Sequence, residues 1–372
     1  MKVCMITGAL PPLKCGVGDY SDILCDYLNK NPNIELNVIT SSNIHSSFNY
    51  NIYNLINKWS ISELTKVLKI VKKLNPDIVH IQYPTLSYKR NIMINMLPYF
   101  LHKRYKVIVT LHEYSDSSIL GKVRSEVGIL FSHFLIVVDD RYNVDLRRKK
   151  IFSKKPIKKI CIGSNIPKSK KTYSELLKLR NKLLLKNKKM IVGYFGFIND
   201  KKGLENIVLA LKLLKDNGYK EFQFNIIGEL YTNNKYHNKI VNMINDLGLN
   251  KEVIITGYLE KQLVGDYVKV CDVIVLPFTD GLSSKNGSFL CALQEEKNII
   301  TTYPQIENVY NIYKKNQYIH FVDRVNNYKE IYDQLIKVCS SVNFKVTKNQ
   351  SVEYLWHNIA DEHYKVYRLL SN

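Results

Sequence analysis

Short β-rich runs alternate with segments of helical apolar spacing along the first half of the chain. Ser60 and Ser62 precede one such segment and are candidate helix caps. Alternation of strands and helices predicts a parallel sheet covered by helices on both faces. The predicted strands cover residues 3–7, 35–40, 78–82, 106–111 and 135–138, and the predicted helices cover residues 19–28 and 60–74.

The alternation stops near residues 162–167 and restarts after a lysine-rich segment with one predicted helix, residues 173–185. A chain of 372 residues is also longer than one hydrophobic core usually supports. We therefore predict two doubly wound, Rossmann-like α/β domains, residues 1–167 and 189–349, a linker over 168–188, and a closing amphipathic helix, residues 351–370, within 350–372. Predicted strands of the second domain cover 191–195, 222–227, 253–256, 273–276 and 299–302, and its helices cover 204–217, 237–247, 262–270 and 287–296.

Parallel sheets of this kind bind ligands at the carboxyl ends of their strands, so two facing sheets create a cleft lined by loops from both. The loop after the first strand contains the prolines Pro11 and Pro12 and also the glycines Gly16 and Gly18. The length of this loop and its prolines do not allow the tight G-x-G-x-x-G turn that binds a dinucleotide. This argues against a dehydrogenase. Asp19 follows, either as an acceptor for a ligand hydroxyl or as a cap of the next helix.

His112 and Glu113 stand at the carboxyl end of the predicted strand 106–111. A histidine there can donate to a sugar hydroxyl or a phosphate, and a carboxylate can accept a proton from an acceptor substrate. The structural alternative is a solvated loop histidine beside a capping glutamate.

Gly196 and Lys202 follow the first strand of the second domain. Gly196 permits close approach of the backbone to a ligand. Lys202 stands at a helix start, where a cation opposes the helix dipole unless an anion is also present. This conflict favours ligand binding over a structural role. Gly228-Glu229 and Gly257-Tyr258-Leu259 follow later strands and line the same edge.

The segment of residues 281–288 lies between a predicted strand and the helix over 287–296. Its small residues let the backbone approach a ligand, Ser288 can cap the helix, and Lys285 adds a positive charge. Free N–H groups at a helix start bind anions, so the segment predicts a phosphate site. An ordinary strand-to-helix turn has the same composition.

A net charge of +21 and a pI near 9.4 predict an anionic partner. One apolar segment, residues 92–101, lies between Lys89-Arg90 and Lys103-Arg104. It is either a surface that rests on anionic lipid or a core helix with solvated ends. The basic runs lack interleaved aromatic residues, which argues against nucleic acid.

The seven cysteines form no C-x-x-C pair, and the nine histidines show no H-E-x-x-H spacing. Reduced thiols and no metal site are therefore expected. The sequence has neither a signal-peptide pattern nor an apolar run of membrane-spanning length. We expect a cytoplasmic protein that can lie on the inner face of a membrane.

The order of these motifs resembles family 4 of the glycosyltransferases, which have the GT-B fold. The resemblance implies retaining transfer from a UDP- or GDP-sugar, bound mainly by the second domain, to an acceptor bound mainly by the first. It also implies that no metal or other cofactor takes part. The resemblance rests on residues 16–20 (GVGDY), 79–84 (VHIQYP), 110–113 (TLHE), 195–197 (FGF) with Lys202-Gly203, 256–258 (TGY) and 276–293, and it extends through the closing helix, which in that fold crosses back to the first domain.

The resemblance assigns a role to each candidate residue. Lys202 matches the lysine that stabilises the leaving diphosphate, and His112 matches a histidine of the cleft. Tyr258 and Leu259 fall where the nucleobase is held. The expected catalytic residues are His112, Lys202 and Lys285; the acceptor-binding residues are Asp19, Tyr20 and Glu113; the donor-binding residues are Gly16, Gly18, Gly196, Phe197, Glu229, Tyr258, Leu259, Gly281, Ser283, Asn286, Gly287 and Ser288.

The chain departs from the family pattern at two places. Phe197 replaces the usual arginine, and Ser283 and Cys291 occupy the positions of the paired glutamates. A subset of the family instead carries a G-x-S-x-R-x-G-S loop, which residues 281–288 resemble with Lys285 in the basic position. Lysine in place of arginine loses bidentate contact with phosphate oxygens.

We therefore expect a retaining glycosyltransferase that transfers a sugar to a glycan or lipid-linked acceptor in bacterial surface polysaccharide assembly. No protein base is compelling, so the donor phosphate can accept the proton of the acceptor. The alternative is a GT-B-shaped binding or scaffold subunit without catalysis, which the missing arginine and glutamates favour.

Overall fold

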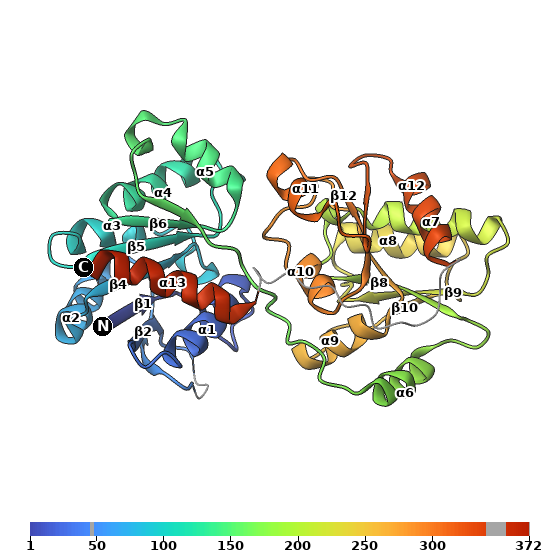
Figure 1. Ribbon diagram of the computed structural model, residues 1–372, viewed down its shortest axis with the longest axis horizontal. Helices are drawn as coiled ribbons and strands as arrows, with labels where there is room; N and C mark the ends of the chain where they lie inside the picture. The colour runs from blue at the N-terminus through green and yellow to red at the C-terminus, as the bar shows by residue number, and fades with distance from the viewer. Residues whose placement is uncertain (45–47, 340–354, 372) are drawn as a thin grey trace. The chain divides into compact units, whose positions relative to one another are not determined.

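The computed structural model describes residues 1–44, 48–339 and 355–371, and the chain forms two compact units (Figure 1). Unit 1 holds Met1–Asn165 together with Val352–Asn372, and unit 2 holds Ile166–Ser351. No helix in the described ranges is both long and apolar enough to cross a bilayer.

Unit 1 is built on a seven-stranded parallel sheet in the order β3-β2-β1-β4-β5-β6-β7. The strand order reverses between β1 and β4, which makes this pair the topological switch point where open α/β sheets bind ligands. The strands are β1 (Lys2–Ile6), β2 (Glu35–Ser41), β3 (Asn51–Ile56), β4 (Ile78–Tyr83), β5 (Lys106–Leu111), β6 (Phe134–Val137) and β7 (Ile157–Lys159).

Helices cover both faces of this sheet, as the alternating sequence pattern predicts. One core contains side chains of α1 and α13, and the other contains side chains of α2, α3, α4 and α5. The helices are α1 (Gly16–Asn29), α2 (Leu64–Leu74), α3 (Met93–Leu101), α4 (Ile119–Phe131), α5 (Asp140–Arg147) and α13 (Trp356–Ser371), with short 3-10 turns η1 (Ile61–Glu63), η2 (Leu86–Tyr88) and η3 (Lys150–Phe152).

The last helix, α13, belongs to the core of unit 1, although unit 2 separates it from that unit in the sequence. Trp356, Ile359 and Tyr367 are buried, and the Trp356 indole N–H donates to the Ser164 carbonyl oxygen at 2.8 Å. The predicted return of the closing helix to the first domain is confirmed. Residues 351–354 of the predicted helix lie outside the described residues.

Unit 2 repeats the design with a six-stranded parallel sheet in the order β10-β9-β8-β11-β12-β13. Its switch point lies between β8 and β11. The strands are β8 (Met190–Phe195), β9 (Phe222–Ile227), β10 (Val253–Ile255), β11 (Val273–Leu276), β12 (Asn298–Thr302) and β13 (Ile319–Val322); the helices are α6 (Tyr173–Leu183), α7 (Leu204–Asp216), α8 (Lys235–Asp246), α9 (Lys261–Val270), α10 (Gly287–Gln294), α11 (Glu307–Tyr313) and α12 (Tyr328–Cys339), with the 3-10 turn η4 (Asp200–Lys202).

The helix of the predicted linker, α6, is anchored to unit 2. The guanidinium of Arg180, itself buried, donates to the carboxylate of Asp272 at 2.8 Å and to the Val270 carbonyl oxygen at 2.7 Å. A buried arginine needs partners of this kind because an unpaired charge in the interior is costly. The segment from Ile166 onward is therefore part of the unit 2 body.

The structure corrects one local expectation and bears out part of another. Ser60 and Ser62 do not cap a helix: their hydroxyl oxygens lie 2.8 Å apart, and Ser60 makes no side-chain cap bond. The apolar segment 92–101 forms α3, whose Met93 and Leu97 are fully buried. The segment is therefore a core helix along one face, while Ile92, Tyr99 and Phe100 are exposed, so contact with lipid stays a prediction.

Candidate functional site

The loops that follow β8 and β11 meet at the switch point of unit 2. A Cβ placed on Gly196 would lie 3.5 Å from the Cβ of Ser288, and one on Gly228 would lie 2.8 Å from the Gly196 carbonyl oxygen. Gly196 has φ +140°, which L side chains rarely adopt. Three loops thus converge here, with glycine required at position 228 by the close contact and favoured at position 196 by its φ.

Lys202 ends the turn η4 and precedes Gly203, whose φ of +65° starts α7. A Cβ on Gly203 would lie 2.3 Å from the Pro277 carbonyl oxygen, so this glycine lets the β8 loop pack on the β11 loop. The Lys202 ammonium lies 4.9 Å from the centre of the Phe278 ring. Lys202 is half-buried at the junction of the two loops.

Several cations gather at this junction. Burial lowers the pKa of Lys202, Asp280 raises it, and Lys285 and Lys201 lower it further. Lys201 is paired with Asp280 at 3.2 Å. Three lysines beside one carboxylate leave a net positive charge, which an anionic ligand would relieve.

The turn over residues 281–288 is held by its own side chains. The Asn286 carboxamide oxygen accepts from the Ser283 amide at 2.6 Å, and the Ser283 hydroxyl oxygen accepts from the Lys285 amide at 3.2 Å. Gly281 has φ +80°, and a Cβ there would lie 2.5 Å from the Tyr303 carbonyl oxygen.

The predicted cap at Ser288 is wrong. Asn286 occupies the N-cap position of α10, and Ser288 lies within the first helical turn. Asn286 makes no side-chain cap bond, because its carboxamide oxygen is bonded to the Ser283 amide. Gly287 therefore opens a helix whose N-cap side chain does not cover its N–H groups, a geometry that suits an anion.

The remaining donor candidates lie at the same carboxyl edge. Phe197 is 84% exposed and Tyr258 is 56% exposed, so both rings face solvent. Leu259 is half-buried, and Glu229 accepts a hydrogen bond from the Tyr231 hydroxyl. The two positions that the family resemblance assigns to the paired glutamates differ in setting, because Ser283 lies in the turn while Cys291 is fully buried in α10.

The first loop of unit 1 is packed tightly. A Cβ on Gly18 would lie 2.9 Å from the Ala9 carbonyl oxygen, so this glycine has a packing role at the start of α1; Gly16 opens α1 and has open space around it. Cys15 is the N-cap of α1, and Asp19 lies in its first turn, so Asp19 is not the cap.

Tyr20 lies in the core of unit 1 with only 2% of its surface exposed. Its hydroxyl lies 3.3 Å from Nε2 of His363, and its ring packs edge-on to His112 at 4.8 Å between centroids. The predicted contact with an acceptor would require this hydroxyl to leave His363. Glu113, in contrast, is exposed in the loop after β5.

His112 is buried and fixed from several sides. Its amide donates to the Tyr83 carbonyl oxygen at 2.8 Å, and its own carbonyl oxygen accepts from the Tyr142 hydroxyl at 2.9 Å. Its Nε2 lies 2.8 Å from Oε1 of Gln82. The solvated-loop alternative for this histidine is therefore wrong, since its ring is only 8% exposed.

Gln82 was missed by the sequence analysis. It is a polar residue in an apolar strand and lies within the segment 79–84 that carries the family resemblance, and it is fully buried between His80 and His112. Lys201 and Asp280 at the unit 2 junction were missed too, because their pairing depends on the fold.

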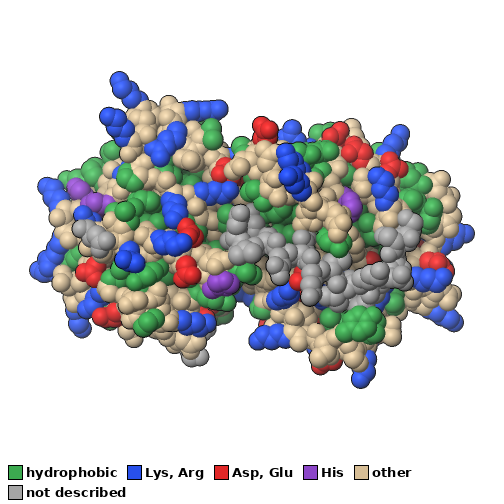
Figure 2. Space-filling model, in the orientation of Figure 1, with side chains coloured by type: hydrophobic (Ala, Val, Ile, Leu, Met, Phe, Trp, Pro, Cys, Tyr) green, Lys and Arg blue, Asp and Glu red, His purple; other side chains and the backbone are tan. Residues whose placement is uncertain are grey.

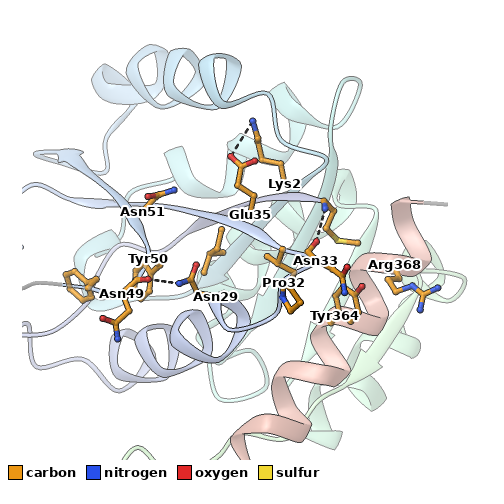
Figure 3. A pocket seen from close by; sticks show the side chains of 14 residues that line it. Lys2, Asn29, Pro32, Asn33, Glu35, Asn49, Tyr50, Asn51, Tyr364 and Arg368 are labelled. Carbon is orange, nitrogen blue, oxygen red and sulfur yellow. Dashed lines mark hydrogen bonds and ion pairs between the residues drawn. The ribbon is translucent and has the colours of Figure 1, made fainter.

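A cavity of about 1090 Å³ lies at the edge of the unit 1 sheet formed by the amino ends of its strands (Figure 3). Residues at the amino ends of β1 and β2 line it together with Tyr364 and Arg368 of α13. Lys2 and Glu35 form an ion pair at 3.4 Å on its wall, and Asn29 donates to the Asn49 carbonyl oxygen at 2.5 Å. None of the predicted site residues lines this cavity.

In the described ranges, no three His, Cys, Asp or Glu side chains are grouped so that they could hold a metal ion. The charged groups at the unit 2 switch point are mainly lysines, which suit phosphate oxygens and not cations. This site can therefore bind an anion directly.

Residues 177–284 match the family model described as Glycosyl transferases group 1. The resemblance to group 1 glycosyltransferases is confirmed over this segment. The matched segment contains Gly196, Lys202 and the first residues of the turn that begins at Gly281. No curated protein matches the sequence.

Solved structures extend the similarity to the whole chain. A glycosyltransferase from Rickettsia africae ESF-5 is 14% identical with a TM-score of 0.76, over 99% of this chain and 98% of its own. Anabaena Alr3699/HepE in complex with UDP and glucose is 14% identical with a TM-score of 0.70, over 100% and 99%. A UDP-GlcNAc 2-epimerase from Methanocaldococcus jannaschii is 16% identical with a TM-score of 0.62, over 99% and 100%. The fold is GT-B, as predicted.

Proposed function

We propose that the chain is a retaining glycosyltransferase of family 4. It transfers a hexose or related sugar from a UDP- or GDP-sugar to a glycan or lipid-linked acceptor in bacterial surface polysaccharide assembly. The observation that carries the proposal is the cluster of Lys202 and Lys285 at the switch point of unit 2. The group 1 match over residues 177–284 supports it.

In the proposed reaction, the bond between the anomeric carbon and the donor phosphate oxygen breaks. The acceptor oxygen bonds to the same face of that carbon, and its proton passes to the departing phosphate. Lys202, Lys285 and the amides at the start of α10 neutralise the leaving diphosphate. His112 of unit 1 orients a sugar hydroxyl.

We further propose that transfer needs no metal, because the lysines supply the positive charge that a divalent cation would otherwise provide. Transfer should continue in EDTA at the rate measured in buffer alone. A loss of turnover in EDTA that Mg²⁺ restores would contradict this part of the proposal.

A screen of UDP-, GDP- and ADP-sugars by thermal shift tests the proposal, because a bound ligand stabilises the folded state. One nucleotide sugar should raise the unfolding temperature, and a Lys202→Ala variant should lose that response. Products must also be examined, since the GT-B fold is shared with an epimerase. Release of an epimerised nucleotide sugar, with no transfer to any acceptor, would reject transfer.

The scaffold alternative has one structural observation in its favour. Phe197 stands, 84% exposed, where the family carries an arginine. If calorimetry detects no binding of any nucleotide sugar while the chain is fully folded, this alternative replaces the transferase. Binding without turnover would also favour it.

A lipid-linked acceptor would bring unit 1 to a membrane, and α4 has a surface that fits. Ile119, Leu120 and Val123 are 81%, 76% and 53% exposed on this helix. Lys122 and Arg124 lie among them, and Arg124 is fixed by the Arg90 carbonyl oxygen at 2.7 Å. Figure 2 shows further Lys and Arg side chains over the upper end of unit 1, where α4 and α5 lie.

We propose that this face of α4 rests on anionic lipid, its apolar side chains entering the headgroup layer between basic ones. The full chain should sediment with phosphatidylglycerol vesicles and not with phosphatidylcholine vesicles. Replacing Ile119 and Leu120 by Ser should abolish sedimentation. The same change at Val325, an exposed residue of unit 2, should not. Equal sedimentation of all variants would reject the surface.

A further inference from the structure

A chain of hydrogen bonds joins the candidate catalytic histidine to the C-terminal helix inside unit 1. His80 and Gln82 alternate on β4 and so point to the same face of the sheet. Nδ1 of His80 lies 2.7 Å from the Tyr367 hydroxyl of α13, and Nε2 of Gln82 lies 3.4 Å from Nε2 of His80. Oε1 of Gln82 lies 2.8 Å from Nε2 of His112. These four residues are nine-tenths buried or more.

The surroundings of Gln82 fix the orientation of its amide. The nitrogen lies 3.3 Å from the sulfur of Met5, and a thioether can only accept. The amide nitrogen is the donor and therefore belongs on the Met5 side. The amide oxygen then faces His112.

The same reasoning fixes the proton of His80. Burial, together with His363 and His112, lowers the pKa of His80, so this ring is neutral and carries one proton. Its Nε2 faces the Gln82 amide N–H and the Thr110 hydroxyl at 2.7 Å, and must accept from them. Its Nδ1–H then donates to the Tyr367 hydroxyl oxygen.

We propose that Gln82 is a positioning residue that holds the His112 ring with a proton on Nε2. A carboxamide oxygen has no proton, so the contact with Oε1 requires an Nε2–H on His112. The acceptor nitrogen of that ring is then Nδ1.

The contacts of His112 show why a residue that fixes its tautomer would affect how the ring meets a substrate. The contacts with Tyr83 and Tyr142 are made by the main chain of His112, whereas the contact with Gln82 is made by a ring nitrogen. A histidine whose tautomer is unspecified spends part of its time with the wrong nitrogen toward the substrate. Gln82 therefore fills the space between the His80 and His112 rings and also sets which nitrogen of His112 carries the proton.

The test is independent of turnover. The full chain is labelled with ¹⁵N-histidine, and a long-range ¹H–¹⁵N spectrum is recorded at a pH where the rings are neutral. His112 is assigned by its absence from the spectrum of His112→Gln. We expect a protonated Nε2 and an unprotonated Nδ1. A protonated Nδ1 in the wild-type chain would overturn the proposal without any variant.

Three variants separate positioning from packing. Gln82→Met keeps the volume without the acceptor and should give a mixture of His112 tautomers. Gln82→Glu keeps an acceptor oxygen and should restore the Nε2–H form. Gln223→Met removes an equally buried glutamine from β9 of unit 2 and should leave His112 unchanged. A pure Nε2–H form in Gln82→Met would overturn the proposal.

The consequence for turnover rests on the proposed function. Gln82→Met should lower kcat by about 10-fold or more and leave the KM for the nucleotide sugar unchanged, because unit 2 carries the donor lysines. If the wild-type chain transfers no sugar while the spectrum shows the expected tautomer, the function fails and the positioning role stands. An unchanged kcat in Gln82→Met, with mixed tautomers, would reject the catalytic consequence.

Discussion

Gly196 lies directly against Ser288, with a distance of 3.5 Å between the Cβ of Ser288 and the position that a Cβ on Gly196 would take. Gly196 begins the loop after β8, and Ser288 lies in the first turn of α10, which follows the loop after β11. A methyl group on Gly196 would touch Ser288 at ordinary van der Waals distance, so the loop after β8 packs against the start of α10. The phosphate groups of a donor would therefore meet backbone and lysine here, and no bulky side chain.

Replacing Gly196 by Ala should weaken donor binding and destabilise the fold. The φ of +140° is unfavourable for alanine and should cost about 1–3 kcal/mol. Thermal unfolding measures that cost, and titration with the nucleotide sugar measures affinity. Gly218→Ala is the control, because Gly218 also has positive φ, +89°, but nothing lies within 4 Å of its Cβ position. Gly218→Ala should be strained yet bind donor normally, and equal affinity in both variants would contradict the placement of the site.

Replacing Lys202 by Ala should reduce kcat/KM by about 100-fold or more, since it removes a half-buried charge beside the leaving group. Lys201→Ala is the matched control. Lys201 is its chain neighbour, but its ammonium is exposed and paired with Asp280. Steady-state kinetics of the two variants measures the loss of kcat/KM in each. Equal losses would show that overall positive charge, and not the position of Lys202, supports turnover.

Unit 1 should lose stability in mild acid. Burial lowers the pKa of His363 to about 4, from an ordinary value of 6.5, although Lys158, Glu362 and the Ile359 carbonyl also act on it. The folded state then binds fewer protons than the unfolded state between these values. The contribution of neutral His363 to stability is fully present above pH 6.5 and is lost as the pH falls toward 4. The free energy of unfolding of unit 1 should fall by roughly 3 kcal/mol over this range.

Tryptophan fluorescence isolates this effect. Trp59 and Trp356 are the two tryptophans of the chain, and both lie in unit 1. Urea unfolding monitored by fluorescence should therefore show a midpoint that falls between pH 6.5 and 4. His363→Gln should reduce this dependence, and the part that remains includes the contribution of His80, whose pKa is also lowered by burial. A midpoint independent of pH in the wild-type chain would contradict the buried, neutral state of His363.

Unit 2 should show the opposite dependence at Glu295. Its carboxylate accepts from the Ser169 amide at 2.7 Å through Oε1, whereas Oε2 has no partner among the described residues. Burial raises the pKa of Glu295 to about 7, above the ordinary 4.5, while that hydrogen bond and nearby lysines lower it. The folded state therefore retains a proton that the unfolded state loses. Stability should fall, by roughly 3 kcal/mol at most, as the pH rises from 4.5 to 7.

Glu295→Gln should abolish this fall, because the amide stays neutral at every pH. Circular dichroism follows both units, so a transition that fluorescence does not report belongs to unit 2. Glu307→Gln, at the exposed start of α11, is the control and should keep the wild-type pH dependence. A flat profile in the wild-type chain would show that Glu295 is ionised in the fold.

The sequence predicts most strands of both sheets, because their apolar runs need no partner to be recognised, and β10 is among them although its residues are partly exposed. It does not predict β7 or β13, whose residues are also partly exposed. It misses β3, whose residues are mostly half-exposed, and α4, whose exposed Ile119 and Leu120 disrupt an amphipathic pattern. Such elements are defined by contacts with distant segments or by a surface role. Neither leaves a local periodic signal.

The same distinction applies to the candidate site. Lys202 can be singled out from the sequence because a cation at a helix start opposes the helix dipole. Gln82 cannot, because its partner His112 is 30 residues away and only strand pairing brings them together. Ser288 was misassigned as a cap for a related reason. The Asn286 side chain binds the Ser283 amide, and that choice depends on the conformation of the whole turn.

The place of α13 in unit 1 has a consequence for synthesis on the ribosome. Unit 2 is complete once its own segment has emerged, since Ile166–Ser351 contains its whole sheet. Unit 1 must wait until Trp356–Ser371 has emerged, because Trp356, Val366 and Tyr367 fill its core. The half of the protein that is translated first is therefore the half that finishes folding last, and its apolar face needs protection while unit 2 is being made.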